Sequence, residues 1–336
     1  MNGIRPTSLS ARPRPDTGAR VRRWRPSPLV LCGIAILALA LLSLALGAAR
    51  LEGQAWFLLW VSRIPRTAAA LLCGAALSVA GVIMQNLVRN RFVEPSTTGV
   101  TEGAMLGLIA VTLLAPAAPV VVKMLVAAVA ALASLAGFLA LLRAVRPRDP
   151  FMVPLIGLIW GGILGAGATW FAWGADLVQY LGAWMQGSFA GAIAGRYELL
   201  WIAGLVAVLA YFAADRLTIV SLGEARAAGL GLNPARVIRF GLAAVAVVTA
   251  LVVVTVGSVP FLGLVVPNIV SRIMGDNLRR SLPVVAAAGA ALTLGADIIG
   301  RVIRWPYEIP VGTVLGVAGA AIFLVLLMRS PARHAS

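Results

Sequence analysis

The sequence predicts an all-α, polytopic membrane protein with about ten transmembrane helices and with both termini in the cytoplasm. Of the 336 residues, 60% are hydrophobic and only 12% are charged, whereas a soluble domain typically carries about 25% charged residues. Apolar runs long enough to cross a bilayer recur along the chain, and arginines collect in alternate breaks between them. We therefore expect lipid, and not water, to surround most of the surface.

The apolar runs define the expected elements in order. The third and eighth runs are short or interrupted by Gly and Pro. Residues 29–329 are expected to form one transmembrane domain, with a short tail at 330–336. The ten expected spans are 29–49, 67–88, 99–115, 120–142, 151–172, 197–214, 239–259, 260–275, 282–300 and 310–328.

Residues 1–28 form a basic segment rich in Arg, Pro and Ser, which we expect to be disordered and cytoplasmic. Arg22-Arg23 before an apolar run also resembles a twin-arginine signal. However, the run from Leu29 to Ala49 has 21 residues and no charge, which is long enough to span a bilayer. The segment is therefore interpreted as a membrane anchor with a basic tail.

The distribution of positive charge supports this topology. With an inside N-terminus, 21 of the 28 Lys and Arg residues fall on the cytoplasmic side, as the positive-inside rule requires. The net charge of +16 is therefore dispersed over loops instead of forming the stripe that nucleic acid would need. No nucleic acid partner is expected.

Residues suited to catalysis or metal binding are scarce. The two cysteines, Cys32 and Cys73, lie within apolar runs, and the single histidine is His334, so neither a disulfide nor a metal site is expected. The acids Glu102, Asp297 and Glu308 lie near the expected helix ends. This pattern disfavours an ion-coupled carrier, which needs an ionisable relay near the midplane, and it equally disfavours an intramembrane enzyme.

The longest cytoplasmic loop, about residues 218–238, has its own local structure. Its Glu/Ala/Arg stretch favours a short helix, which Gly229, Gly231 and Pro234 then terminate. The segment is either an ordinary connector or a docking helix for a cytoplasmic partner. An ATPase would have to be such a partner, because Lys123 is the only lysine and no Gly-Lys-Ser/Thr phosphate loop exists.

Two expected spans carry glycines at four-residue spacing: Gly157, Gly161 and Gly165 in one, and Gly312 and Gly316 in the other. This spacing puts the glycines on one helix face, so that two backbones can approach closely. The stripes indicate either static packing or helices that slide or line a pathway.

Four of the few cations expected outside are Arg63, Arg66, Arg301 and Arg304. Interfacial arginines often only extend to lipid headgroups. Because the outer side is otherwise poor in positive charge, these arginines are also candidate docking points for acidic groups.

Taken together, the motifs resemble those of the FecCD-type permeases, the membrane subunits of ABC importers for iron-siderophores, haem and cobalamin. The resemblance covers about Arg63 to Arg329, and the order and spacing of its motifs are more specific than any one of them. The motifs are Arg63-Ile-Pro-Arg66, the Gly74 to Gly81 run continuing to Gln85, Arg89-Asn90 to Glu94-Pro95, Gly187-Ser188, Gly223-Glu224 to Leu230-Gly231, Phe261 to Pro267, Ala296-Asp297 to Arg301, and Glu308 to Gly312.

The resemblance implies a non-enzymatic import permease of the bacterial inner membrane that binds no cofactor itself. Its implied partners are a second permease (a copy or a paralogue), two cytoplasmic ATPases that use ATP and Mg, and an extracytoplasmic substrate-binding protein. Arg63, Arg66 and Arg301 would receive acidic residues of the binding protein, and the two glycine-striped helices would line the pathway. The ATPase would couple to Gly223, Glu224, Ala225, Arg226, Ala228, Leu230, Gly231 and Leu232.

Departures from the usual pattern bear on the substrate. Pro267 is followed by Asn268 where many members have His, and the Asn-Pro-Leu-Ala turn reads Asn90-Arg91-Phe-Val. The Pro-Asn-Ile-Val-Ser form resembles the branch that imports catecholate or mixed siderophores, so a ferric siderophore is the expected substrate. Haem or cobalamin transport within the same family and, further off, ion-coupled transport remain the alternatives.

Overall fold

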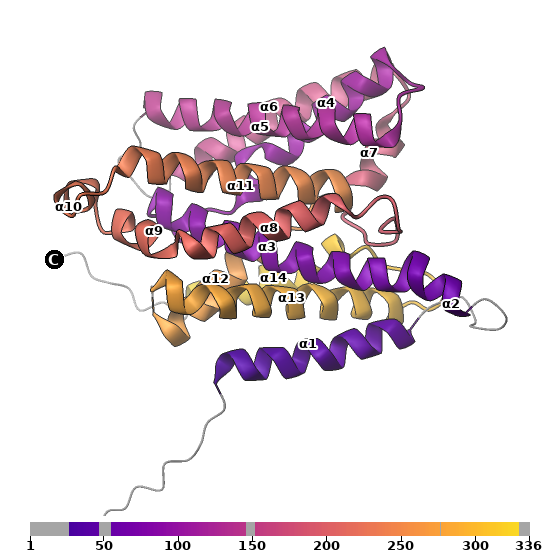
Figure 1. Cartoon of the computed structure of the whole chain (residues 1–336). Coiled ribbons are helices and arrows are strands. Elements are labelled where there is room, and N and C mark those ends of the chain that lie inside the picture. The colour runs from indigo at the N-terminus through magenta and orange to yellow at the C-terminus, as the bar shows by residue number, and fades with distance from the viewer. Residues whose placement is uncertain (1–26, 47–54, 146–151, 276, 329–336) are drawn as a thin grey trace, which may run out of the picture.

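The computed structural model describes residues 27–46, 55–145, 152–275 and 277–328, and within these ranges it contains helices and no β-strand. The helices run side by side in a bundle (Figure 1). Most of the predicted tail 1–28, and all of 330–336, lie outside the described residues. The longer helices are α1 (Pro28–Ala45), α3 (Ile64–Val88), α4 (Val100–Leu114), α5 (Val120–Val145), α6 (Met152–Gly174), α8 (Leu199–Phe212), α11 (Pro234–Val256), α12 (Leu262–Met274), α13 (Leu278–Val302) and α14 (Val311–Met328). The shorter ones are α2 (Ala55–Leu58), a π-helical turn (Leu59–Arg63), a 3-10 turn (Pro95–Thr98), α7 (Val178–Met185), α9 (Ala214–Ser221) and α10 (Glu224–Gly229).

Each of the ten predicted apolar segments overlaps one of these helices, which confirms the all-helical fold class. Seven helices are long and apolar enough to cross a membrane, and α8 with α9 forms an eighth candidate bent by 64°. Helices α4 and α12 have only 15 and 13 residues, or about 22 and 20 Å, less than the roughly 30 Å of a hydrocarbon core. The number of crossings and the side of each terminus stay predictions.

The second span begins earlier than predicted, at Trp56 and not at residue 67. The prediction began the helix after Pro65, but the chain is already helical through the π-helical turn that precedes it. A proline has no N–H to donate to the carbonyl four residues back. That carbonyl, of Val61, instead accepts a hydrogen bond from the Ala194 N–H at 3.0 Å. Consequently Arg63 and Arg66 lie inside a continuous helix.

Helix α3 is the centre of the bundle, and α8, α11, α12 and α13 pack around it. Glycines permit two of these contacts. A Cβ atom on Gly74 would lie 2.4 Å from the Gly289 carbonyl oxygen on α13, and one on Gly81 would lie 2.1 Å from the Gly263 oxygen on α12. The Gly74–Gly81 run therefore sets the close backbone packing of the core.

The helices also divide into groups along the bundle. Helices α4, α5 and α6 pack together at one side, whereas α1 lies at the opposite edge against α13 (Figure 1). Helix α10 projects at one end of the bundle and α2 lies at the other. The predicted cytoplasmic loop and the predicted outer arginines therefore occupy opposite ends.

Candidate functional site

At the end of the bundle that carries α2, four charged side chains form one ionic cluster. Asp297 accepts from Arg66 Nη2 at 2.8 Å through one oxygen and from Arg301 Nη2 at 2.7 Å through the other. The second terminal nitrogen of Arg66 donates to Glu308 Oε1 at 2.9 Å. Asp297 and Arg301 share a face of α13 because they are four residues apart. The cluster thus connects α3, α13 and the segment that precedes α14.

Arg301 of this cluster and the nearby Arg63 also hold the end of α1. The last carbonyls of a helix have no partner within the helix and carry partial negative charge. Arg63 Nη1 donates to the Leu44 oxygen at 2.8 Å, and Arg301 Nη1 donates to the Leu46 oxygen at 3.2 Å. Two guanidinium groups therefore cap α1 from neighbouring helices.

The buried hydroxyl of Ser43 also takes part in the contacts between α1 and its neighbouring helices. Ser43 Oγ accepts from Arg301 Nη2 at 2.7 Å and forms a second hydrogen bond with the Thr67 hydroxyl at 2.8 Å. Ser43 is the one buried residue of α1, a helix whose other described side chains are at least partly exposed. Its hydroxyl supplies the polar contact that fixes α1 against α3 and α13.

The structure brings together the three arginines predicted for docking, and it shows that they already have partners. Side-chain exposure is 5% for Arg301 and 14% for Arg66, against 35% for Glu308. Arg304 is exposed and lies 5.9 Å from the centre of the Tyr307 ring. Sequence reasoning missed the partner acids, although the four-residue spacing of Asp297 and Arg301 was a signal. The docking role itself stays a prediction.

At the opposite end, the predicted short helix is confirmed as α10, and glycines flank it. Gly223 precedes it with φ +131° and Gly231 follows it with φ +78°. The Gly231 N–H donates to the Ala228 oxygen at 2.9 Å, and the Leu232 N–H donates to the Ala227 oxygen at 3.1 Å. This pair of bonds is a Schellman motif, which requires the left-handed backbone that glycine adopts readily.

Most of the residues predicted for coupling are presented to solvent. Ala225, Arg226, Ala228 and Gly231 are exposed, and Leu230 is 70% exposed. Arg226 folds back to donate to the Leu222 oxygen at 3.1 Å, and Leu222 is itself exposed. Two exposed leucines, Leu222 and Leu230, therefore flank this short helix.

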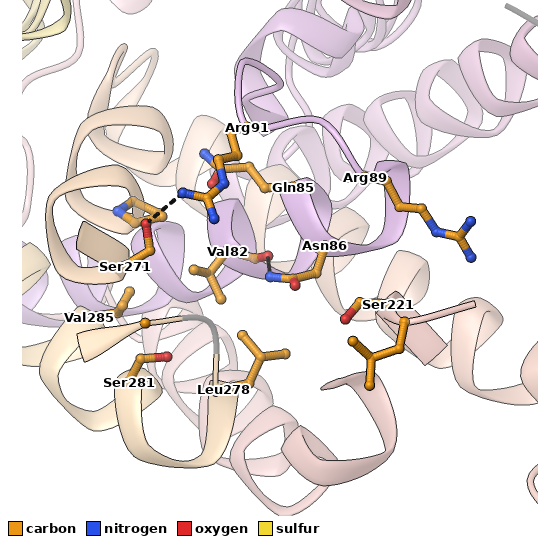
Figure 2. Close-up of a pocket in the computed structure, with 13 residues that line it drawn as sticks. Val82, Gln85, Asn86, Arg89, Arg91, Ser221, Ser271, Leu278, Ser281 and Val285 are labelled. Atoms are coloured by element: carbon orange, nitrogen blue, oxygen red, sulfur yellow. Dashed lines mark hydrogen bonds between the residues drawn. The ribbon is translucent and has the colours of Figure 1, made fainter. Parts of the chain in front are cut away.

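A polar cavity of about 300 Å³ lies beside this segment, between the end of α3, α12 and the start of α13 (Figure 2). Arg91 Nη1 donates to Ser271 Oγ at 3.3 Å across one side of the cavity. The hydroxyls of Ser221 and Ser281 and the amide of Asn86 lie around the remainder of the lining (Figure 2). Ser221 and Leu222 line this cavity and are separated from α10 only by Gly223, so the cavity adjoins the projecting helix.

The glycine stripes make specific contacts within the chain. Gly161 and Gly165 of α6 face Glu102 of α4, since Cβ atoms there would lie 3.4 and 3.5 Å from its side chain. A Cβ atom on Gly312 would lie 2.3 Å from the Gln186 oxygen. Gly157 is buried, and Gly316 has only Pro260 nearby, at 3.7 Å. The static-packing interpretation therefore holds for Gly312, while a pathway role for the stripes stays a prediction.

In the part of the chain that the structure describes, no three His, Cys, Asp or Glu side chains come together as a candidate metal site. Cys73 is buried and Cys32 is partly exposed, and neither forms a disulfide. The candidate functional features are thus an ionic cluster at one end and a projecting helix with a polar cavity at the other.

The described helices that are long and apolar enough to cross a membrane indicate a multi-pass membrane protein. The model of the FecCD transport family matches residues 24–329, and the chain belongs to this family.

Several curated proteins are similar over most of their length. The chain is 41% identical over 274 residues to the petrobactin import system permease protein YclN of Bacillus subtilis, covering 82% of this chain and 87% of that protein. It is 40% identical over 304 residues to the petrobactin import system permease protein FatD of Bacillus anthracis, covering 90% and 91%. It is also 35% identical to the vitamin B12 import system permease protein BtuC of Klebsiella pneumoniae, covering 94% and 96%.

A solved structure shares the fold. A metal-chelate type ABC transporter in an inward-facing conformation superposes with a TM-score of 0.77 at 25% sequence identity, covering 91% of this chain and 99% of that chain. The family membership expected from the motifs is therefore confirmed.

Proposed function

We propose that this chain is the membrane permease of an ATP-binding-cassette importer that carries a ferric siderophore across the inner membrane. The observation that carries the proposal is the 40–41% identity to two petrobactin import permeases over at least 82% of the chain. The chain supplies a path and a coupling element, and it makes no covalent bond. Its expected companions are a second permease, two ATPases and an extracytoplasmic binding protein.

Helix α10 is the proposed contact for the ATPase. It projects from the end of the bundle opposite α2 (Figure 1), and the exposed Leu230 that follows it offers an apolar group that a cleft in a partner can bury. The Schellman motif at its C-terminal end helps to keep α10 formed while it is exposed. ATP and Mg would be bound by the ATPase.

Movement of α10 would reach the helices through the neighbouring chain. Helix α9, on the N-terminal side, is bent by 64° from α8, and its Asp215 forms an ion pair with Arg279 at the start of α13. The polar cavity of Figure 2 lies between α9, α12 and α13. A push on α10 would therefore be transmitted to several helices, which is what alternating access requires.

The ionic cluster at the other end is the proposed docking point for the binding protein. Of its members, Glu308 is the most exposed, and its partner Arg66 is held against Asp297 on the other side. A carboxylate of the binding protein could replace Glu308 on Arg66 without disturbing the buried pair. Docking would then be an exchange of ion-pair partners, with Arg63 and Arg301 positioning the cluster.

A second permease would pair with the apolar surfaces that the chain leaves uncovered. Exposed large side chains on α6 and α14 include Leu158, Trp170 and Val317. Lipid or a partner must cover such faces. We infer that part of this surface pairs with the second permease and that the glycine-striped helices border the pathway.

Reconstitution tests the proposal. The permease is placed in proteoliposomes with its neighbouring subunits, and accumulation of a radiolabelled ferric catecholate siderophore is measured with and without ATP. Cobalamin is the matched competitor, because a vitamin B12 permease is also 35% identical. Preferential accumulation of cobalamin would move the assignment to that branch of the family.

A further inference from the structure

A second cavity, of about 330 Å³, lies among α5, α7 and α11. Helix α7 lies at the end of the bundle that carries α2, opposite α10 (Figure 1). The polar and aromatic residues that line the cavity are Lys123, Tyr180, Trp184, Ser188, Arg196 and Thr255. None of them belongs to the ionic cluster or to the α10 segment.

The cavity carries positive charge that no carboxylate of the described residues neutralises. The ammonium group of Lys123, the only lysine of the chain, donates to the neutral Pro116 oxygen at 2.9 Å. The exposed Arg196 guanidinium makes neither a hydrogen bond nor an ion pair with another described residue. No described carboxylate lines the cavity. In contrast, Arg66 and Arg301 at the same end are both paired with acids.

Aromatic and hydroxyl groups complete the lining. Tyr180 and Trp184 are four residues apart on α7 and therefore share a face. Ser188 Oγ accepts from the Ala190 N–H at 3.1 Å, which leaves the hydroxyl proton available to a ligand. Two cations, a hydroxyl donor and two aromatic rings together favour a ligand that combines negative charge with a flat or apolar body.

We propose that this cavity binds an anionic group attached to a flat or apolar body. The volume lies at the lower end of the usual range for ligand pockets, so the site fits one such group. Two sources share this chemistry: an ionised aromatic arm of the incoming chelate and the headgroup of an anionic phospholipid. The first source rests on the proposed function, whereas the second does not.

A bound ligand would also fix α7 relative to α14. Immediately after α7, the Ser188 N–H donates to the Val256 oxygen at 2.8 Å, and the Gly187 oxygen accepts from the Gly312 N–H at 3.0 Å. A ligand that joins α7 to Lys123 of α5 therefore restrains the segment that contacts the start of α14. Occupancy of the site is therefore expected to depend on the position of α14.

Equilibrium dialysis of the full-length permease in phosphatidylcholine nanodiscs tests the site. The probe is 2,3-dihydroxybenzoate, an anionic aromatic molecule, and the matched control is neutral catechol. We expect saturable binding of the probe, with a dissociation constant about tenfold higher in the double variant Lys123→Gln with Arg196→Gln. Arg143→Gln removes an exposed arginine near the opposite end of α5, outside the cavity, and should leave binding unchanged. Equal binding by the double variant, or equal binding of catechol, would overturn the proposal.

The source of the group is resolved by adding phosphatidylglycerol to the nanodiscs. Retention of the probe identifies the chelate arm as the source. Displacement of the probe, with native mass spectrometry showing phosphatidylglycerol held by the wild type and lost from the double variant, identifies the lipid headgroup. Failure of the site is distinguishable from failure of the proposed function, because uptake is measured separately on the assembled wild-type importer.

Discussion

Asp297 and Arg301, one helical turn apart on α13, form an ion pair of 2.7 Å in which the two side chains are only 3% and 5% exposed. The other carboxylate oxygen of Asp297 accepts a hydrogen bond from Arg66 on α3. One carboxylate therefore neutralises parts of two guanidinium groups in a region of low dielectric constant. Removing a single member of such a pair leaves a buried charge without its partner, which is more costly than never having had the pair.

Replacement of that carboxylate should destabilise the fold. Asp297→Asn is expected to lower the free energy of unfolding by about 3 kcal/mol, because Arg66 and Arg301 lose their shared anion. The measurement is equilibrium unfolding in mixed detergent micelles. Glu308→Gln is the matched control, and its loss should stay below about 1 kcal/mol because Glu308 is much more exposed. Equal losses in the two variants would contradict the role given to Asp297.

Docking of the binding protein should depend on Arg66 and not on Glu308. Arg66→Gln is expected to weaken docking about tenfold, because the incoming carboxylate loses its partner. Glu308→Gln removes the carboxylate that would be displaced, so affinity should be retained or increased. The affinity of the binding protein is measured on permease that is embedded in nanodiscs and immobilised on a surface. Unfolding curves confirm that both variants are folded. Weaker docking in the Glu308 variant would reject the exchange of ion-pair partners.

Changes in the α10 segment should uncouple ATP hydrolysis from transport. Leu230→Asp places a charge on the exposed apolar residue that the ATPase is proposed to bury, and Glu224→Arg reverses a charge in the same helix. Both variants are expected to lower uptake at least about tenfold, with ATPase activity no longer stimulated by the loaded binding protein. Arg143→Gln, near the exposed end of α5 and outside the 218–238 loop, is the control and should behave as wild type. Normal coupling in Leu230→Asp would exclude α10 as the contact.

Two glycines allow a direct test of the packing. Gly81→Ala would place a methyl carbon 2.1 Å from the Gly263 oxygen, whereas Gly162→Ala would meet nothing within 4 Å. The first substitution is expected to cost about 1–3 kcal/mol of stability, because α3 and α12 must separate, and the second should be neutral. Thermal unfolding in detergent measures both, and similar midpoints for the two variants would disprove the close approach of α3 and α12.

The sequence was sufficient to locate the helices and the projecting segment, since these depend on local composition. The charge-free run that forms α1 and the Gly229, Gly231 and Pro234 terminators around α10 are local signals that tertiary packing did not override. The predicted start of the second span, at residue 67 and not at Trp56, was wrong for a local reason as well. Pro65 normally marks a boundary, but here a hydrogen bond from Ala194 satisfies the carbonyl that the proline leaves free.

The partners of the arginines could not be predicted, because they are distant in the chain. Arg66 and Asp297 are separated by 231 positions, and no periodicity connects them. The same is true of the cavity at α7, whose two cations, Lys123 and Arg196, belong to different segments. Composition indicated that outer cations were scarce, whereas only the packing of the helices revealed which of them are neutralised.

The most direct test of the account is accumulation of a radiolabelled ferric catecholate siderophore by proteoliposomes that contain this permease, its companion subunits and the binding protein. Accumulation is expected only with hydrolysable ATP, and it should be lost in the Leu230→Asp variant although the chain remains folded. Accumulation that follows a proton or sodium gradient and ignores ATP would contradict the account.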